Sequence, residues 1–134
     1  MNTRRSPGRE DPAPQLVTNV FARACTSRAA FEDVTGKWAS LALIALGEGT
    51  HRFGELRRRV EGVSEKMLSQ ALQSLERDGM VTRTVVTPIP PRVEYSLTPL
   101  GARVAHQLRA LADVLEETAP NVTLARDAYQ ARTP

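Results

Sequence analysis

Two short amphipathic segments that meet at a glycine constrain the fold more than any other feature of this sequence. In residues 51–60 (HRFGELRRRV) and 64–79 (SEKMLSQALQSLERDG), apolar side chains recur at spacings of three and four, as expected for helices with one buried face. These apolar residues are Phe53, Leu56 and Val60 in the first segment and Met67, Leu68, Ala71, Leu72 and Leu75 in the second. Gly62 interrupts the pattern, the Ser64 hydroxyl can cap the second helix, and Gly79 can end it. The sequence therefore predicts two helices joined by a tight turn.

Two runs rich in β-branched and aromatic residues follow these helices. Residues 81–87 (VTRTVVT) and 93–98 (VEYSLT) alternate partly between apolar and polar side chains, which favours short strands. The linker at 88–92 (PIPPR) cannot be helical, because proline lacks the amide hydrogen that a helix needs. This order of elements is typical of a winged helix-turn-helix. We therefore predict a mainly helical α+β fold with a two-stranded wing, in which residues 51–98 form the head.

Two further helices are expected before the head. Residues 27–34 favour a short helix with Thr26 or Ser27 as its cap. Residues 37–46 (KWASLALIAL) form a strongly apolar stretch of about three turns, too short to span a membrane. We expect this second segment to be the central helix of the core.

A long helix is expected after the head. Thr98 can cap it, and Pro99 suits its first position because an amide hydrogen is not needed there. Its apolar stripe consists of Leu100, Val104, Leu108, Leu111 and Leu115. We expect this helix to end before Pro120, and residues 120–134 to add a short helical turn or to fray.

Length and composition fit one folded domain. The 134 residues are 41% hydrophobic and 25% charged, which is ordinary for a globular protein. No apolar run approaches the roughly 18 residues of a membrane helix, and the N-terminal residues lack the apolar stretch of a signal peptide. We expect a soluble, cytoplasmic protein with no membrane partner. The predicted organisation is a flexible N-terminal arm at 1–19, a folded domain at 20–119 and a C-terminal tail at 120–134.

Positive charge is concentrated in the head. Between residues 51 and 92, eight basic residues stand against five acidic ones, although the net charge of the chain is only +3. The basic residues are Arg52, Arg57, Arg58, Arg59, Lys66, Arg77, Arg83 and Arg92. Because basic side chains that neutralise phosphates release counterions, this surplus favours a polyanionic partner. Together with the helix-turn-helix pattern, it leads us to expect double-stranded DNA.

The outer face of the second head helix suits base recognition. The major groove of B-DNA admits one α-helix; glutamine can bond adenine through two hydrogen bonds, and lysine can reach guanine or phosphate. The predicted base-reading residues are Ser64, Lys66, Ser69, Gln70 and Gln73. The alternative is that these common polar residues only cover a solvent-exposed helix face.

Further basic residues are predicted to contact the DNA backbone. The predicted phosphate contacts come from Lys37, Arg52, Arg57 and Arg58. Arg92, in the loop between the strands, can enter a minor groove or hold a phosphate. The alternative for Arg92 is an ion pair with Glu94.

No group of side chains indicates catalysis or a metal site. His51 and His106 are far apart in the sequence and accompany no catalytic motif. The single cysteine, Cys25, allows neither an intrachain disulfide nor a Cys/His metal cluster. We therefore expect no enzyme activity, no catalytic residues, no metal and no cofactor. A winged helix that binds only another protein is a further alternative, and it would need apolar residues on the outer face of the second head helix.

Four motifs in order resemble the HxlR family of bacterial transcription regulators. They are Gly-Lys-Trp at 36–38, Phe-x-Glu-Leu-Arg at 53–57, Ser-x-Lys-Met-Leu at 64–68 and Pro-Arg-Val-Glu-Tyr-x-Leu-Thr-x-x-Gly at 91–101. The resemblance covers residues 25–117 and implies a homodimer in which the terminal helices of the domain pair with the partner subunit. It also implies a repressor on a pseudo-palindromic operator, since a two-fold dimer places its reading helices ~34 Å apart. Alternatively, the apolar stripe of the long helix packs only within the chain.

The resemblance also singles out Cys25, which lies where several family members carry a cysteine that senses oxidants or electrophiles. The thiolate is the reactive form, and Arg23 or Arg28 could lower the thiol pKa from its usual value of about 8.5. The available products are an intersubunit disulfide, a mixed disulfide with a small thiol and an alkylated adduct. Two alternatives stay open: Cys25 is simply a buried apolar residue, or the signal is a small aromatic ligand held near Phe31 and Trp38.

Overall fold

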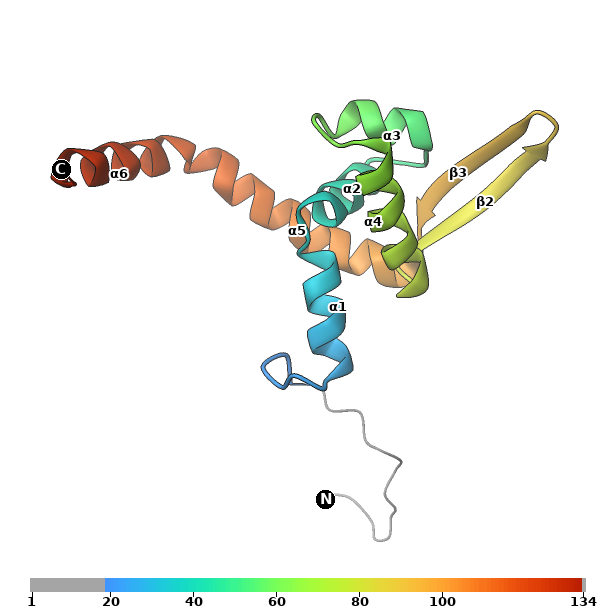
Figure 1. The fold of residues 1–134 in the computed structure, drawn as a ribbon, viewed down its shortest axis with the longest axis horizontal. Helices are drawn as coiled ribbons and strands as arrows, with labels where there is room; N and C mark the ends of the chain where they lie inside the picture. Colours follow the sequence, from blue (N-terminus) through green and yellow to red (C-terminus); the bar gives the residue numbers. More distant parts are fainter. Residues whose placement is uncertain (1–18, 134) are drawn as a thin grey trace, which may run out of the picture.

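Helix α2 lies at the centre of the molecule, with other helices packed around it and a β-hairpin wing that projects from one side (Figure 1). The structure is a computed structural model that describes residues 19–133. Its elements are α1 (Thr26–Val34), α2 (Lys37–Gly47), β1 (His51–Arg52), α3 (Phe53–Arg59), α4 (Glu65–Arg77), β2 (Val81–Pro88), β3 (Pro91–Leu97), α5 (Pro99–Glu117) and α6 (Ala119–Arg132). This order confirms the predicted mainly helical winged helix-turn-helix.

Helix α2 is buried because its residues are small or apolar around most of its circumference. Ala42 and Leu43 are fully buried, and Ala39, Ala45 and Leu46 are nearly so. A helix that is apolar on most sides is stable only inside a core, and α2 packs against α1, α3, α4 and α5. The predicted central core helix is confirmed, and it extends one residue further than predicted.

Helices α3 and α4 form the predicted pair around a turn at Gly62. The Ser64 hydroxyl accepts a hydrogen bond from the Met67 amide at 3.1 Å and so caps α4. Gly62 and Gly79 have φ angles of +92° and +76°, in the left-handed region that favours glycine. The buried leucines of the pair are Leu56, Leu68, Leu72 and Leu75. The expectation that Met67 is also buried is wrong: its side chain is 46% exposed, because it lies about 100° around the helix from Leu68, at the edge of the buried stripe.

The wing is an antiparallel hairpin of β2 and β3, with Val81 opposite Leu97 at its base. The sheet also contains β1, which the sequence does not indicate, because two residues are too few to show alternation. His51 of β1 pairs with Tyr95 of β3, so the strand order is β1-β3-β2. This pairing fixes the base of the wing to the start of α3.

The first turn of α5 lies against the end of the helix-turn-helix. As predicted, Thr98 caps α5, with its hydroxyl oxygen accepting from the Gly101 amide at 3.0 Å, and Pro99 occupies the first position. The same hydroxyl donates to the Gly79 carbonyl at 2.6 Å. A Cβ on Gly101 would overlap the backbone carbonyl of Met80, so the close approach of α5 requires glycine.

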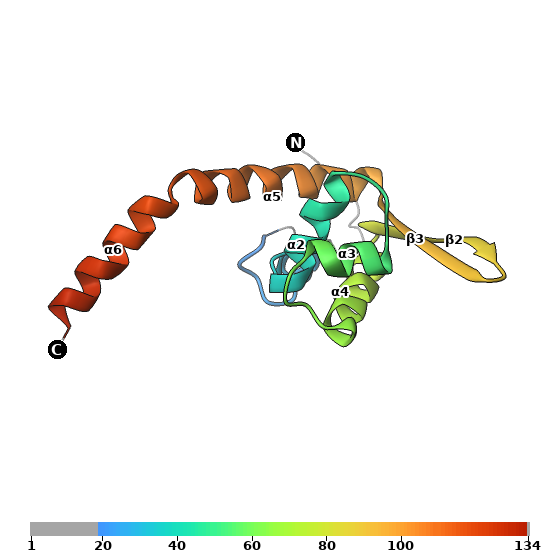
Figure 2. The same cartoon turned by 90° about the horizontal axis from the view of Figure 1, so that it is seen from above.

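Helix α5 runs across the body, and α6 continues beyond it, at the opposite end from the wing (Figure 2). The predicted end of the long helix before Pro120 is confirmed, since α5 ends at Glu117. The chain then forms a second helix of 14 residues, longer than the predicted turn or frayed end. Pro120 lies in the first turn of α6, where its missing amide hydrogen does no harm. Every residue of α6 is exposed.

The predicted flexible arm at residues 1–19 lies outside the described residues, apart from Asn19. Between residues 19 and 133, no helix is both long and apolar enough to cross a membrane. Over the same range, no group of three or more His, Cys, Asp or Glu side chains is arranged to hold a metal ion.

Candidate nucleic-acid interface

The predicted base-reading residues share one face of α4. Lys66, Gln70 and Gln73 are exposed, and their spacing of four and three places them in one stripe along the helix. Within the described part of the chain, no hydrogen bond or ion pair engages these three side chains. Ser69 is half-buried beside them, and Ser64 is exposed at the start of the helix. Because the Ser64 oxygen already accepts from an amide of α4, its hydroxyl is left to donate.

The predicted phosphate-contacting residues of the head differ in whether another side chain of the protein already binds them. Arg52 and Arg58 are exposed. Arg57 bonds Glu65 at 3.2 Å, which links α3 to α4 across the turn. Both partners of this pair are largely exposed, so the bond is weak, and a phosphate can compete with Glu65 for the guanidinium.

The base of the wing lies beside the polar face of α4 that carries the predicted base-reading residues. A hollow of about 580 Å³ separates them, and Ser69, Gln73 and Arg83 all contribute to its lining. The sequence indicates Arg83 only as one of the basic residues, although it follows the buried Val81 by two positions along β2 and so lies on the same face of the strand. Arg92 lies 3.6 Å from Glu94 on the same strand, so the alternative ion pair forms while the arginine stays half-exposed.

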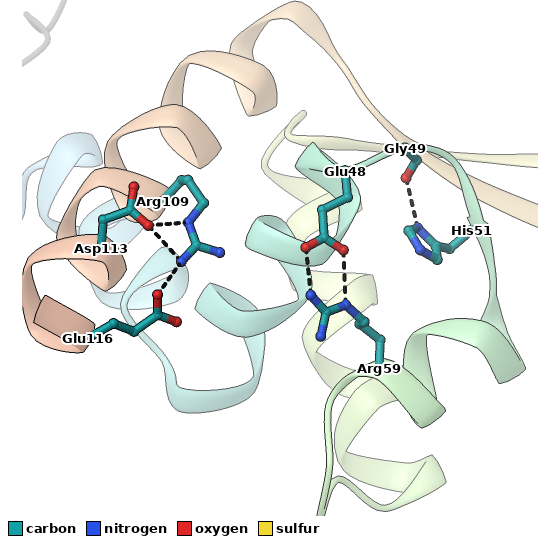
Figure 3. A network of polar contacts seen from close by, with 7 residues as sticks. All are labelled: Glu48, Gly49, His51, Arg59, Arg109, Asp113 and Glu116. Carbon is teal, nitrogen blue, oxygen red and sulfur yellow. Dashed lines mark hydrogen bonds and ion pairs between the residues drawn. The ribbon is translucent and has the colours of Figure 1, made fainter.

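A two-point ion pair positions the C-terminal end of α3. The Arg59 guanidinium donates to both Glu48 carboxylate oxygens, at 2.9 and 2.7 Å (Figure 3). The hydrogen bonds and charge of Arg59 hold the pKa of the Glu48 carboxyl below its ordinary value, although partial burial opposes this. Next to this pair, His51 Nδ1 lies 2.8 Å from the Gly49 carbonyl oxygen. The Arg59 side chain is therefore held in an ion pair within the fold, unlike that of its neighbour Arg58.

A second ion-pair cluster lies on α5. Arg109 bonds Asp113 at 2.9 Å and Glu116 at 3.1 Å (Figure 3). All three residues belong to one helix, and hydrogen bonding to Asp113 raises the pKa of the Arg109 guanidinium. The cluster therefore makes one part of the α5 surface charged, and it does not involve the apolar residues of the helix.

Cys25, not Thr26 or Ser27, caps α1. Its thiol accepts from the Arg28 amide at 3.4 Å and lies 2.7 Å from the Ser27 hydroxyl, and the residue is only 3% exposed. Burial raises the pKa of the Cys25 thiol, but hydrogen bonds from Ser27 and from backbone amides outweigh it and leave the pKa below its ordinary value. The Arg28 guanidinium, which was expected to do this, instead bonds Glu32 at 2.7 Å.

The two residues of the predicted ligand pocket lie in different surroundings. Phe31 is exposed and lines an apolar groove of about 840 Å³ between α1 and α5, together with His106. Trp38 packs against the core, and the Lys37 ammonium lies over its ring at 4.4 Å. Lys37 is thus partly held by the ring, and Trp38 is absent from the lining of the groove.

Comparison with known proteins gives consistent matches over most of the chain. A family model described as HxlR-like helix-turn-helix matches residues 33–123. The chain is 53% identical over 109 residues to the uncharacterized HTH-type transcriptional regulator YtfH of Escherichia coli, which covers 81% of this chain and 86% of that protein. The structure of the transcriptional regulator YtfH from Salmonella typhimurium has a TM-score of 0.76 at 51% identity, covering 81% of this chain and 97% of that one. The redox regulator HypR in its reduced form has a TM-score of 0.66 at 30% identity, covering 72% of this chain and 96% of that one.

Proposed function

This chain belongs to the HxlR-like helix-turn-helix family of transcriptional regulators, and we propose that it acts as a homodimeric repressor on a pseudo-palindromic operator. As a regulator of this family it binds DNA and is not an enzyme. The observation that carries the proposal is the stripe of Lys66, Gln70 and Gln73 on α4, which is exposed and lies beside the base of the wing.

In the proposed complex, α4 lies in the major groove and its polar stripe contacts base edges. Gln70 and Gln73 each offer one donor and one acceptor to adenine, and Lys66 donates to guanine or phosphate. Arg52, Arg58 and Arg92 contact phosphates on either side. The polar character of the stripe is the reason to prefer DNA over a protein partner, since a protein-binding face would have an apolar centre.

The apolar surface of the last two helices supports a homodimer. Leu111, Val114 and Leu115 on α5 are each more than half exposed, and α6 adds Leu124 and Tyr129. Helices of about 12–15 residues are barely stable alone in water, and α6 buries no residue within its own chain. A second copy that covers this surface would stabilise α6 and place the two α4 helices ~34 Å apart.

The proposal is tested by fluorescence anisotropy with duplexes tiled across the intergenic DNA beside the gene for this protein, at several salt concentrations. We expect one duplex to bind selectively and with strong salt dependence. Gln70→Ala should lose most of this selectivity, while the matched control Gln130→Ala on α6 should bind like the wild type. If no duplex is preferred, or if both variants behave alike, the proposed base reading is wrong.

We further propose that Cys25 is the regulatory residue. The supporting observations are its lowered thiol pKa, its position as the cap of α1, and the similarity of the chain to a redox regulator. Diamide would accept two electrons and two protons while two Cys25 thiols, one from each subunit, form a disulfide. A small thiol could replace one of them. Because Cys25 is buried, either reaction requires the start of α1 to open, which would disturb the dimer.

The switch is tested by repeating the titration after diamide treatment. Selective binding should be lost in the wild type and retained in Cys25→Ser, since serine also caps helices well. If diamide has no effect on the wild type, the apolar groove between α1 and α5 favours the alternative signal, a small aromatic ligand. Phe31→Ala should then abolish the response to that ligand, while Cys25→Ser should keep it.

A further inference from the structure

Ile89 at the tip of the wing is the most exposed large apolar side chain among residues 19–133, with 89% of its surface accessible. It occupies the end of the hairpin, the part of the head farthest from the core (Figure 1). Nothing in the fold needs an isoleucine there, because a hairpin tip is favoured by polar residues and glycine. An apolar side chain at this position therefore points to a contact outside the chain.

Prolines restrict the backbone of the tip, and a basic residue lies behind it. Three prolines, Pro88, Pro90 and Pro91, surround Ile89, and the Thr87 hydroxyl donates to the Pro90 carbonyl at 3.1 Å. Proline fixes the backbone φ angle, so little conformational freedom is lost when the tip meets a partner. Arg92 on β3 lies opposite Thr87 on β2, directly behind the tip. The wing thus presents an apolar tip with a half-exposed guanidinium behind it, 3.6 Å from the Glu94 carboxylate.

The wing is longer than the distance between neighbouring DNA grooves. Eight residues of extended strand span roughly 24 Å. Along one face of B-DNA, the centres of the major and minor grooves lie about half a turn apart, roughly 17 Å. Because the base of the wing lies beside the reading face of α4, a wing attached to a helix in the major groove can reach the flanking minor groove.

We propose that Ile89 is an apolar wedge that enters the minor groove beside each half-site, partly unstacks one base step and bends the DNA. Isoleucine and proline are among the side chains that can part a base step in this way, and Arg92 holds the adjacent phosphate. The proposal rests on the DNA-binding function above. It adds a contact that depends on how easily the flanking step deforms, so the protein would discriminate among sequences that α4 does not touch.

The test compares Ile89→Thr with Ile89→Val on the duplex that the wild type binds most tightly after selection from a random library. Valine and threonine have nearly the same shape and differ mainly in polarity, and neither should disturb an exposed position. Three readouts are needed: affinity across salt concentrations, the end-to-end distance of a duplex labelled at both ends, and the fluorescence of 2-aminopurine placed at successive flanking steps.

We expect Ile89→Val to bind within about twofold of the wild type and Ile89→Thr to bind on the order of tenfold more weakly. Ile89→Thr should also lose the bend and the rise in 2-aminopurine fluorescence while keeping the salt dependence. Arg92→Ala, in contrast, should reduce the salt slope by about one. Unchanged bending and fluorescence in Ile89→Thr would overturn the wedge, whatever its affinity. A wild type that selects no duplex would instead refute the sequence-selective DNA binding on which the wedge depends.

Discussion

Helices α4 and α5 both present a face to solvent, but the two faces differ in chemistry. The exposed stripe of α4 is polar and consists of Lys66, Gln70 and Gln73. The exposed stripe of α5 is apolar and consists of Leu111, Val114 and Leu115. Water can hydrogen-bond to the polar side chains of the first stripe, so α4 is stable in solution without a bound partner. The apolar side chains of the α5 stripe form no hydrogen bonds with water, and their exposure favours a permanently bound partner. We therefore propose that the same fold separates a reversible DNA-binding surface from a lasting dimer surface.

The largest expected effect comes from a charge placed on the α5 stripe. In Leu111→Glu or Leu115→Glu, association would bury an unpaired carboxylate, so the dimer dissociation constant should rise on the order of a hundredfold or more. Sedimentation equilibrium measures this change. Ala102→Glu adds the same charge at an exposed position of α5 on the side away from this stripe and should have a smaller effect. Monomeric wild type, or equal effects of all three substitutions, would show that the apolar stripe is not the dimer surface.

A second prediction concerns the buried end of the same helix. Gly101→Ala should lower the free energy of unfolding by about 1–3 kcal/mol, because the new Cβ overlaps the Met80 carbonyl. The sign is informative, since an alanine in a helix normally stabilises it relative to glycine. Gly54→Ala in α3, where the nearest atom to a new Cβ is the flexible end of Arg58, should stabilise. Thermal unfolding of both variants tests this, and a stabilised Gly101→Ala would disprove the close approach of α5.

The smallest effect is expected where α4 ends against α1. Burial raises the pKa of the Asp78 carboxyl, and a hydrogen bond and charge from Asp33 raise it further, against the opposing charge of Arg77. Arg77 lies 3.5 Å from Asp33 and 3.8 Å from Asp78. Ionised Asp78 is thus disfavoured in the folded state. This penalty is full above the raised folded pKa, falls as the pH drops through it, and vanishes below the unfolded value.

Asp78→Asn should therefore raise the stability at neutral pH, by less than about 1 kcal/mol, since the site is partly exposed. It should also flatten the gain in stability that the wild type shows on mild acidification. Urea unfolding at pH 7 and pH 5 compares the two proteins. A variant with an unchanged pH profile would show that Asp78 is ionised in the fold at both values.

Local chemistry made most of the head predictable from the sequence. Ser64 and Gly79 bound α4 through contacts with residues only a few positions away, and Thr98 does the same for α5. The features that could not be predicted from the sequence depend on contacts between residues far apart in the chain. Strand β1 exists only because His51 meets Tyr95, and Arg83 joins Gln73 only once the wing folds back beside α4.

The ends of the described chain were harder to predict for another reason. Cys25 is an unusual helix cap, so sequence patterns favour its hydroxyl-bearing neighbours. Pro120 is compatible both with the end of a preceding helix and with the first turn of a following one; both apply here, but only the end of α5 was expected. Helix α6 has no buried face within its own chain, so the usual hydrophobic period gives little indication of it.

The central claim is that the polar stripe of α4 reads DNA sequence, and selection from a random duplex library tests it most directly. The wild type should enrich an inverted repeat with half-site centres about one helical turn apart. Gln70→Ala combined with Gln73→Ala should keep the spacing and salt dependence but lose the preference at the positions those side chains contact. If the double variant enriches the same bases as the wild type, or if the wild type enriches none, α4 does not read the sequence.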